Sequence, residues 1–405
     1  MSRPTKKLGS WLRRHSLTLV AALGGAAGVA YAAGWHKPAA APAAEVMPAI
    51  AVEPVRDNIQ DTVQIALLLD TSGSMDGLIN QARAHLWNMV DQMGKMTRIV
   101  DGKVRGVKIE LALYEYGNST LPASEGYIRQ VLPFTGDLDK VSEKLHGLFT
   151  NGGSEYAGQA IQVSSTKLQW SSDPAALKFI YVAGNEEFDQ GPISAADAMA
   201  AAAKNNISVQ LIYCGSKDAT WESAAKLAKS DLATIDQNQV AVHIPSPQDA
   251  EILRLGDELN GTYMAYGAEG QASSARQKSA DMSSAKMSPK VAIERAALKS
   301  KKAYRNESWD VVDAAETNGK FLETASDDKL PAAMRGKSLA EKQQMVAANA
   351  ATRAELKSKI GKLEAERTAY VEAERKKAGG PAEQSLDTEL LKTTKKIATK
   401  KGYKF

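Results

Sequence analysis

The residues best suited to chemistry are one aspartate and two serines that follow an apolar run. In QIALLLDTSGSMDG (residues 64–77), Asp70, Ser72 and Ser74 stand at every second position. The spacing gathers a carboxylate and two hydroxyls around a tight turn, in which Gly73 relieves the backbone. Their hard oxygen atoms suit Mg²⁺ or Ca²⁺ rather than a soft metal. The alternative is that Asp70 and Ser74 only cap the following helix, without a metal.

The elements around these residues form an alternating pattern. TVQIALLLD (residues 62–70) is a short aliphatic run, which predicts a buried strand. In residues 77–96 apolar side chains recur at helical spacing, which predicts an amphipathic helix. Strands and helices alternate up to about residue 267, which predicts a doubly wound, mostly parallel α/β sheet with helices on both faces. Ligands of such sheets bind beyond the carboxyl ends of the strands, where Asp70 stands.

In this context, DTSGSM resembles the metal-ion-dependent adhesion site (MIDAS) of von Willebrand factor type A (VWA) domains. The resemblance covers about residues 62–267. NGGSEYAGQAI (residues 151–161) resembles the family's GGT loop, which implies that Ser154 takes the place of a metal-binding threonine. The family implies a Rossmann-like fold and a bound Mg²⁺ or Ca²⁺ that coordinates an acidic residue of a partner protein. The implied function is protein binding, in adhesion or scaffolding.

One position departs from the family pattern. The family's fourth strand usually ends in TDG, whereas FIYVAGNEEFDQG has Gly184 at the aligned position. Asn185, with an amide oxygen, is one candidate to replace the aspartate, and Glu186, Glu187 or Asp189 could each bring a carboxylate from the following loop. A missing carboxylate should weaken metal binding, because ligand charge tunes affinity for hard cations. The alternative function is therefore a structural or assembly protein with a degenerate, metal-free domain. The same loop also resembles exported bacterial VWA proteins with a helical C-terminal region.

The N-terminal segment predicts export. A basic stretch precedes an uncharged run of about 19 residues, near the lower limit for a membrane span. Ala30 to Ala32, AYA, fits a leader cleavage site. Residues 1–32 are therefore predicted to be a signal peptide or an anchor in the inner membrane, and residues 33–61 a Pro/Ala-rich linker. The expected location is the periplasm or cell envelope.

The C-terminal part is predicted to be helical. Residues 268–290 are small and polar, which predicts a linker, and residues 291–405 are predicted to form a helical region with a long helix over 338–376. A seven-residue apolar seam comprises Leu339, Val346, Leu356, Ile360, Leu363 and Tyr370. Four polar residues interrupt it: Lys342, Asn349, Arg353 and Arg367. The seam predicts a coiled-coil hairpin or packing within the chain, and the latter is favoured because its apolar part is short. The basic end, TTKKIATKKGYKF, is expected to be a solvated tail.

Composition excludes several classes of function. With 43% hydrophobic and 24% charged residues, the chain has the composition of a globular protein, and a net charge of +4 gives no case for nucleic acid binding. Cys214 is the only cysteine, so no disulfide can form within the chain. A hydrolase is the least favoured alternative, because no nucleophile, base and orienting group occur in a recognisable arrangement. We therefore expect no enzyme activity, and the oligomeric state stays open.

Overall fold

The computed structural model describes residues 56–239, 242–378 and 385–405. Every described element belongs to one compact unit, Glu53–Phe405.

Most of the residues of the N-terminal segment, for which the sequence predicts a leader and a linker, lie outside the described ranges. The signal peptide or anchor (residues 1–32) lies wholly outside the described residues. Strand β1 begins at Arg56, inside the segment 33–61 that the sequence predicts as a linker. Within the described ranges, the helices are all too short or too polar to cross a membrane.

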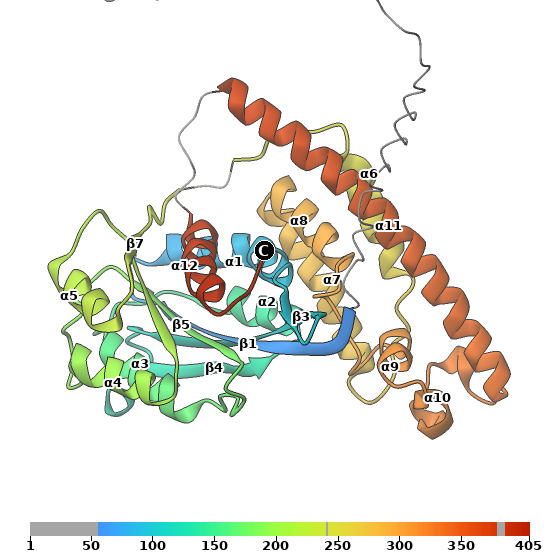
Figure 1. Ribbon diagram of the computed structural model, residues 1–405, viewed down its shortest axis with the longest axis horizontal. Coiled ribbons are helices and arrows are strands. Elements are labelled where there is room, and N and C mark those ends of the chain that lie inside the picture. Colours follow the sequence, from blue (N-terminus) through green and yellow to red (C-terminus); the bar gives the residue numbers. More distant parts are fainter. Residues whose placement is uncertain (1–55, 240–241, 379–384) are drawn as a thin grey trace, which may run out of the picture. The chain divides into compact units, whose positions relative to one another are not determined.

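A seven-stranded sheet organises the first half of the described chain (Figure 1). The strands are β1 (Arg56–Asp70), β2 (Arg98–Val100), β3 (Lys103–Tyr116), β4 (Ile128–Thr135), β5 (Leu177–Gly184), β6 (Ser208–Tyr213) and β7 (Leu232–Thr234). Their order is β2-β3-β1-β5-β6-β7, with β4 also paired to β3. The pairs along β3-β1-β5-β6-β7 are parallel, and β2 and β4 run antiparallel to β3. The predicted mostly parallel, doubly wound fold is confirmed.

The helices account for most of the remaining chain. Those interleaved with the strands are α1 (Asp76–Gly94), α2 (Leu138–His146), α3 (Ala157–Lys167), α4 (Ala195–Lys204) and α5 (Ala219–Ala228). Those that follow are α6 (Asp249–Asn260), α7 (Gly270–Met287), α8 (Pro289–Lys299), α9 (Val311–Thr317), α10 (Phe321–Thr324), α11 (Leu339–Ala378) and α12 (Leu386–Lys400). Short 3-10 turns occur at Ala123–Glu125, Asp327–Lys329 and Ala332–Met334.

Side-chain alternation along β1 divides the core between the two faces of the sheet. Ile65 and Leu67 point into a cluster with α1, α2 and α12, whereas Ala66 and Leu68 point into a cluster with α3, α4 and α5. All four side chains are at most 5% exposed. A strand buried on both faces needs a continuous apolar sequence, which explains the run that ends at Asp70.

The C-terminal residues, from α12 onward, cover one face of the sheet. Helix α12 lies along α1, and the buried hydroxyl of Tyr181 on β5 bonds to Thr394. The phenol of Tyr403 donates to Asp61 on β1 at 2.9 Å. Lys404 forms an isolated antiparallel bridge with Thr97. The expectation of a solvated basic tail was therefore wrong: the lysines face outward, and the apolar side of the same helix covers the sheet.

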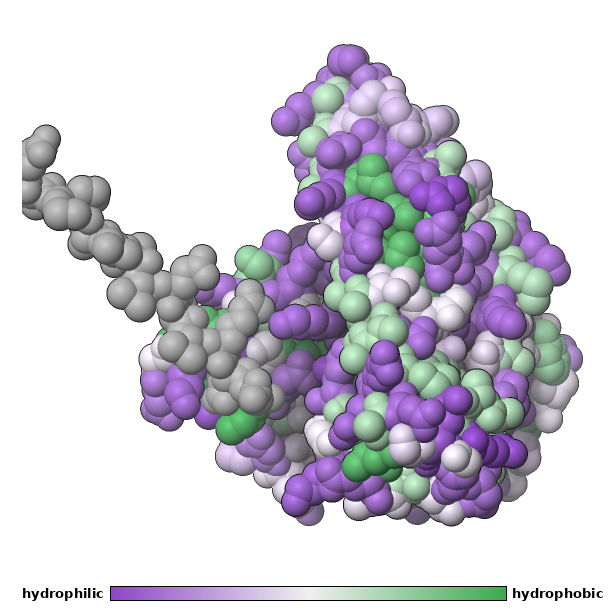
Figure 2. Space-filling model, turned by 90° about the vertical axis from the view of Figure 1, so that its right-hand side faces the viewer, coloured by the Kyte–Doolittle hydropathy of each residue, from purple (hydrophilic) through white to green (hydrophobic). Residues whose placement is uncertain are grey.

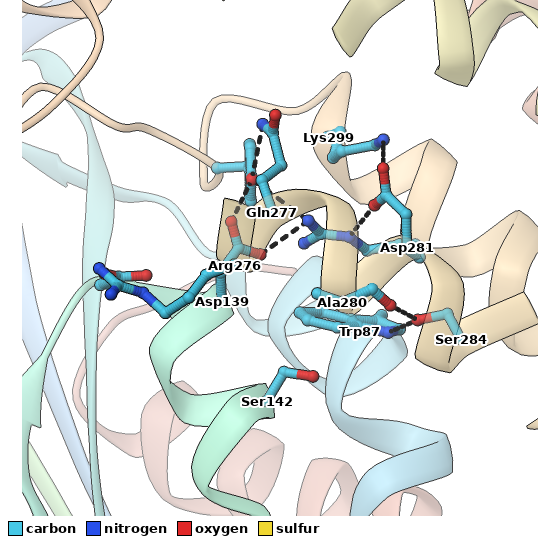
Figure 3. Close-up of polar contacts among 12 residues, drawn as sticks. Trp87, Asp139, Ser142, Arg276, Gln277, Ala280, Asp281, Ser284 and Lys299 are labelled. Carbon is cyan, nitrogen blue, oxygen red and sulfur yellow. Dashed lines mark hydrogen bonds and ion pairs between the residues drawn. The ribbon is translucent and has the colours of Figure 1, made fainter. Parts of the chain in front are cut away.

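Residues 268–290, predicted as a polar linker, contain helix α7. Its buried residues are small or amide-bearing: Gly270, Ser273, Gln277, Ala280 and Ser284. Figure 3 shows Ser284 accepting a hydrogen bond from the indole of Trp87 on α1 (2.9 Å), while Asp281 pairs with Lys299 on α8 (2.7 Å). Hydropathy gives no signal for such a helix, because hydrogen bonds and small residues make its contacts.

The polar residues that interrupt the seam of α11 all have partners within the chain. Lys342 pairs with Asp327, Asn349 contacts Met264, Arg353 pairs with Asp310 and Asp313, and Arg367 pairs with Asp249. The apolar middle of the seam packs on α6 and α8, so that Leu356 and Ile360 are buried. Leu339 and Tyr370 near its two ends are 40% and 38% exposed. Figure 2 shows the face beside α9 and α10, where hydrophilic residues predominate around small apolar groups.

Arg353 makes the most buried of these pairs, which leads to a stability prediction. Its guanidinium lies 2.7 Å from Asp310 and 2.9 Å from Asp313, and it stacks 4.2 Å from the ring centre of Tyr263. We expect Arg353→Met to lower the free energy of unfolding by about 3–5 kcal/mol, because it leaves two buried carboxylates without a cation. Urea unfolding measures this. The exposed Lys359→Met is the control and should leave the midpoint unchanged, whereas equal midpoints for the two variants would contradict the account.

Candidate metal centre

The candidate site lies where β1 and β5 end side by side. The two strands pair in register up to Leu69 and Ala183, so Asp70 and Gly184 are the next residues of each. The Asp70 side chain is fully buried, and Ser72 is 3% exposed. The backbone N–H of Ser72 donates to Asp70 Oδ1 at 2.7 Å. This bond folds the turn back over the carboxylate.

The geometry contradicts the helix-cap alternative. Helix α1 begins at Asp76, its N-cap residue is Met75, and no side chain caps it. The oxygen atoms of Asp70 and Ser74 therefore do not satisfy the free N–H groups of this helix.

The loop after β5 contributes to the same place. The amide nitrogen of Asn185 donates to Ser74 Oγ at 3.0 Å, although the two residues are far apart in sequence. Glu186 is exposed, and its charge is close enough to raise the pKa of Asp70. Of the candidates to replace the aspartate, Asn185 therefore contacts the serine turn (Asp70–Ser74), whereas Glu186 lies at the rim and Glu187 and Asp189 are exposed.

Backbone hydrogen bonds join the loop that carries Ser154 to the turn that follows β1. The N–H of Asn151 donates to the carbonyl of Thr71 at 3.0 Å, and the carbonyl of Gly152 accepts from Ser119 at 2.7 Å. Ser154 itself is half-buried. The structure therefore places three loops together: the serine turn, the Asn151–Ser154 loop and the loop after β5.

Tyr116 explains why position 184 is glycine. The Tyr116 hydroxyl is buried and donates to the carbonyl of Ala183 at 3.0 Å. A Cβ added at Gly184 would lie 2.5 Å from this hydroxyl and 3.2 Å from Asp70 Oδ2. An aspartate at this position would therefore collide with the tyrosine.

A substitution at Gly184 tests this packing. We expect Gly184→Ala to cost about 1–3 kcal/mol of unfolding free energy, since overpacking a buried site forces its neighbours to move. The matched control is Gly152→Ala, where a Cβ would meet nothing within 4 Å. Chemical denaturation of both variants measures the difference. Equal stability would show that Tyr116 moves aside without cost.

Sequence reasoning missed Glu155, which follows Ser154 and is only 6% exposed. Its carboxyl lies close to the side chains of Asp70 and Ser72. Burial, followed by the charge of Asp70, raises the pKa of Glu155 to about 9. Burial also raises the pKa of Asp70 to about 6, against the lowering effect of the Ser72 N–H. The only sequence signal for Glu155 is its place beside Ser154.

The residues present fit a hard divalent cation. Three buried oxygen atoms, Asp70 Oδ2, Ser72 Oγ and Asn185 Oδ1, have no hydrogen-bond partner. Buried polar atoms normally have one, so these oxygens are available to a ligand. Carboxylate, hydroxyl and amide oxygens are the donors that Mg²⁺ and Ca²⁺ take. Asp70, Ser72, Ser74 and Ser154 would hold such an ion, which would supply a positive charge to an acidic group.

The raised pKa values predict how pH affects the metal-free protein. Asp70 and Glu155 hold their protons more tightly in the folded state, and Glu186, the Tyr116 hydroxyl and the Cys214 thiol also face them. Their contribution to stability is complete below about pH 4 and is lost as pH rises through about 6 and then about 9. In EDTA, the melting temperature should therefore fall between pH 5 and pH 9.

The double variant Asp70→Asn/Glu155→Gln is the control for this pH series. It should show a flatter fall in melting temperature, because it removes both titrating groups. A profile parallel to that of the wild type would mean that other groups cause the pH dependence.

Comparison with known families agrees with this geometry. Residues 64–248 match the family model of the von Willebrand factor type A domain. This part of the chain is a VWA domain. The VWA match begins within β1 and ends just before α6, so it contains all three loops of the site. A comparison with curated proteins gave no match.

Solved structures similar to the VWA domain come from diverse proteins. Proximal thread matrix protein 1 from the mussel byssus, in a form with a zinc-occupied MIDAS motif, is 11% identical (TM-score 0.33; 45% of this chain, 43% of that one). An aerotolerance-related membrane protein from Bacteroides fragilis is 17% identical (TM-score 0.30; 44% and 93%). The SpRpn10 VWA domain is 16% identical (TM-score 0.31; 46% and 100%). This chain thus spans less than half of the mussel protein.

Proposed function

We propose that this protein is an exported, metal-dependent protein-binding module. Its VWA domain binds Mg²⁺ or Ca²⁺ through Asp70, Ser72, Ser74 and Ser154, and the ion coordinates an acidic residue of a partner protein. The observation that carries the proposal is the set of three buried oxygen atoms without partners at the ends of β1 and β5. The proposed location is the periplasm or cell envelope, with residues 1–32 as signal peptide or membrane anchor.

Metal binding is tested by stability. Mg²⁺ or Ca²⁺ added to EDTA-treated protein should raise the melting temperature in proportion to the logarithm of its concentration once the site saturates. Asp70→Ala should abolish the increase, and Asp189→Ala, in the exposed loop after β5, should preserve it. Absence of any increase in the wild type would overturn the metal claim.

Partner binding and export need separate tests. A cross-linked pull-down from envelope extracts should recover a protein with wild type and Mg²⁺, but not with EDTA or Asp70→Ala. Recovery of the same protein under all three conditions would contradict a metal-bridged contact. Fusion of residues 1–55 to alkaline phosphatase tests export, because this reporter is active only after it leaves the cytoplasm.

Catalysis has no place in the proposal, because the described histidines are engaged elsewhere. His85 pairs with Asp387, His146 bonds to the Ser142 carbonyl and His243 pairs with Asp249. The glycine at position 184 favours a second candidate, a metal-free domain used in assembly. Light scattering distinguishes the two candidates: assembly through α11 predicts an oligomer that is insensitive to EDTA.

A further inference from the structure

The site lacks a carboxylate on the β5 side and has an extra one on the opposite side. Gly184 cannot carry a carboxylate, because the Tyr116 hydroxyl fills the space that a Cβ would need. On the other side of Asp70, Gly117 at the end of β3 leaves room for a side chain. Glu155 occupies that room.

Close packing fixes Glu155 beside Asp70. A Cβ added at Gly117 would lie 2.8 Å from Glu155 Cγ and 2.8 Å from Asp70 Oδ1, so both side chains lie against the same face of the glycine. The Glu155 backbone N–H donates to Gln190 Oε1 at 3.2 Å, and its carbonyl accepts from Ala157 at 2.9 Å. Gly117 and these bonds hold the carboxyl toward the serine turn.

The strongest charged influences on these two carboxyls are acidic. In the described part of the chain they are the two carboxyls themselves, each acting on the other, and Glu186. Burial of a carboxylate without a counter-charge is costly. The unpartnered atoms Asp70 Oδ2 and Ser72 Oγ are themselves buried and lie at the same turn. Without a cation, protonation neutralises Glu155, as its raised pKa shows, whereas a divalent cation would let both carboxyls ionise and bind it.

We propose that Glu155 is the second carboxylate ligand of the cation site and replaces the aspartate that the VWA family has at the position of Gly184. This inference rests on the proposed function. Two carboxylates, Asp70 and Glu155, balance the charge of a divalent ion before any partner binds. Glu186, being exposed, is a rim residue rather than a ligand.

Mn²⁺ affinity, measured by electron paramagnetic resonance of the free ion, tests the role of Glu155 in the full chain. We expect Glu155→Gln to weaken Mn²⁺ binding at least tenfold, Glu155→Asp to weaken it less, and Glu187→Gln, an exposed control in the loop after β5, to leave it unchanged. Circular dichroism verifies that each variant is folded. Unchanged or tighter binding by folded Glu155→Gln would overturn the inference.

A second measurement does not depend on a Glu155 variant. In protein with ¹³C-labelled glutamate carboxyls and the substitution Glu186→Gln, electron–nuclear double resonance of bound Mn²⁺ should show a ¹³C coupling from a directly bound carboxylate. Absence of the coupling, with Mn²⁺ bound, would overturn the role of Glu155 but not the metal site. If the wild type binds no Mn²⁺, both the inference and the proposed function fail. If Asp70→Asn loses Mn²⁺ binding and Glu155→Gln retains it, the inference about Glu155 fails and the proposed function stands.

Discussion

Replacement of Asp70 by alanine is expected to reduce Mg²⁺ affinity by more than about 100-fold. In the proposed site it removes a direct carboxylate ligand, and loss of even an outer-shell partner costs about 10–100-fold in metal proteins. Isothermal titration calorimetry on EDTA-treated protein measures the affinity. In EDTA, the variant should melt at or above the temperature of the wild type, since it also removes a buried carboxyl whose pKa is raised to about 6.

This pair of results separates a ligand from a structural residue. A buried aspartate that only supported the fold would destabilise the metal-free protein when removed and would leave any metal binding intact. Retention of wild-type Mg²⁺ affinity by Asp70→Ala would therefore contradict the site described for the VWA domain. Asp189→Ala is the matched control, because it removes a carboxylate of the exposed neighbouring loop.

Removal of residues 385–405 is expected to destabilise the VWA domain by about 5–10 kcal/mol, which approaches the whole stability of a typical domain. The deletion uncovers one face of the sheet, and it removes the buried side chains of Leu386, Leu390 and Tyr403. Each such side chain contributes about 1.5–3 kcal/mol. The deletion also breaks the 3.0 Å pair between His85 and Asp387. Urea unfolding of a chain that ends at residue 384 measures the loss.

Point variants within α12 give a graded version of this experiment. Leu390→Ala should cost about 2–5 kcal/mol, as large-to-small changes in cores do. Lys400→Ala, on the exposed side of the same helix, should leave the midpoint unchanged. An undiminished unfolding midpoint for the shortened chain would show that the sheet does not need α12.

The fold of the sheet region and the serine turn were predictable because their signals are local. A strand buried on both faces needs an unbroken apolar run, and a turn that presents three oxygen atoms needs its residues in sequence order. Leu67, Asp70 and Ser72 therefore reveal their roles within a few positions. The family match then confirmed the resemblance over residues 64–248.

The parts that the sequence did not reveal depend on contacts between distant segments. Glu155 is a ligand candidate because Gly117, which directly follows β3, leaves space beside Asp70. The role of Gly184 depends in the same way on the Tyr116 hydroxyl. The sequence of helix α12 has the composition of a basic tail, yet Tyr181 on β5 bonds to its Thr394. Each of these contacts joins segments that are far apart in the sequence, so no local sequence pattern predicts it.

The most direct test of a cation at the ends of β1 and β5 is a crystal structure of the full chain grown with MnCl₂. Anomalous diffraction should show one manganese peak in contact with Ser72 and Ser74, with the carboxylates of Asp70 and Glu155 directed at it. Absence of a peak there at saturating Mn²⁺, or a peak only at other surface carboxylates, would contradict the metal centre.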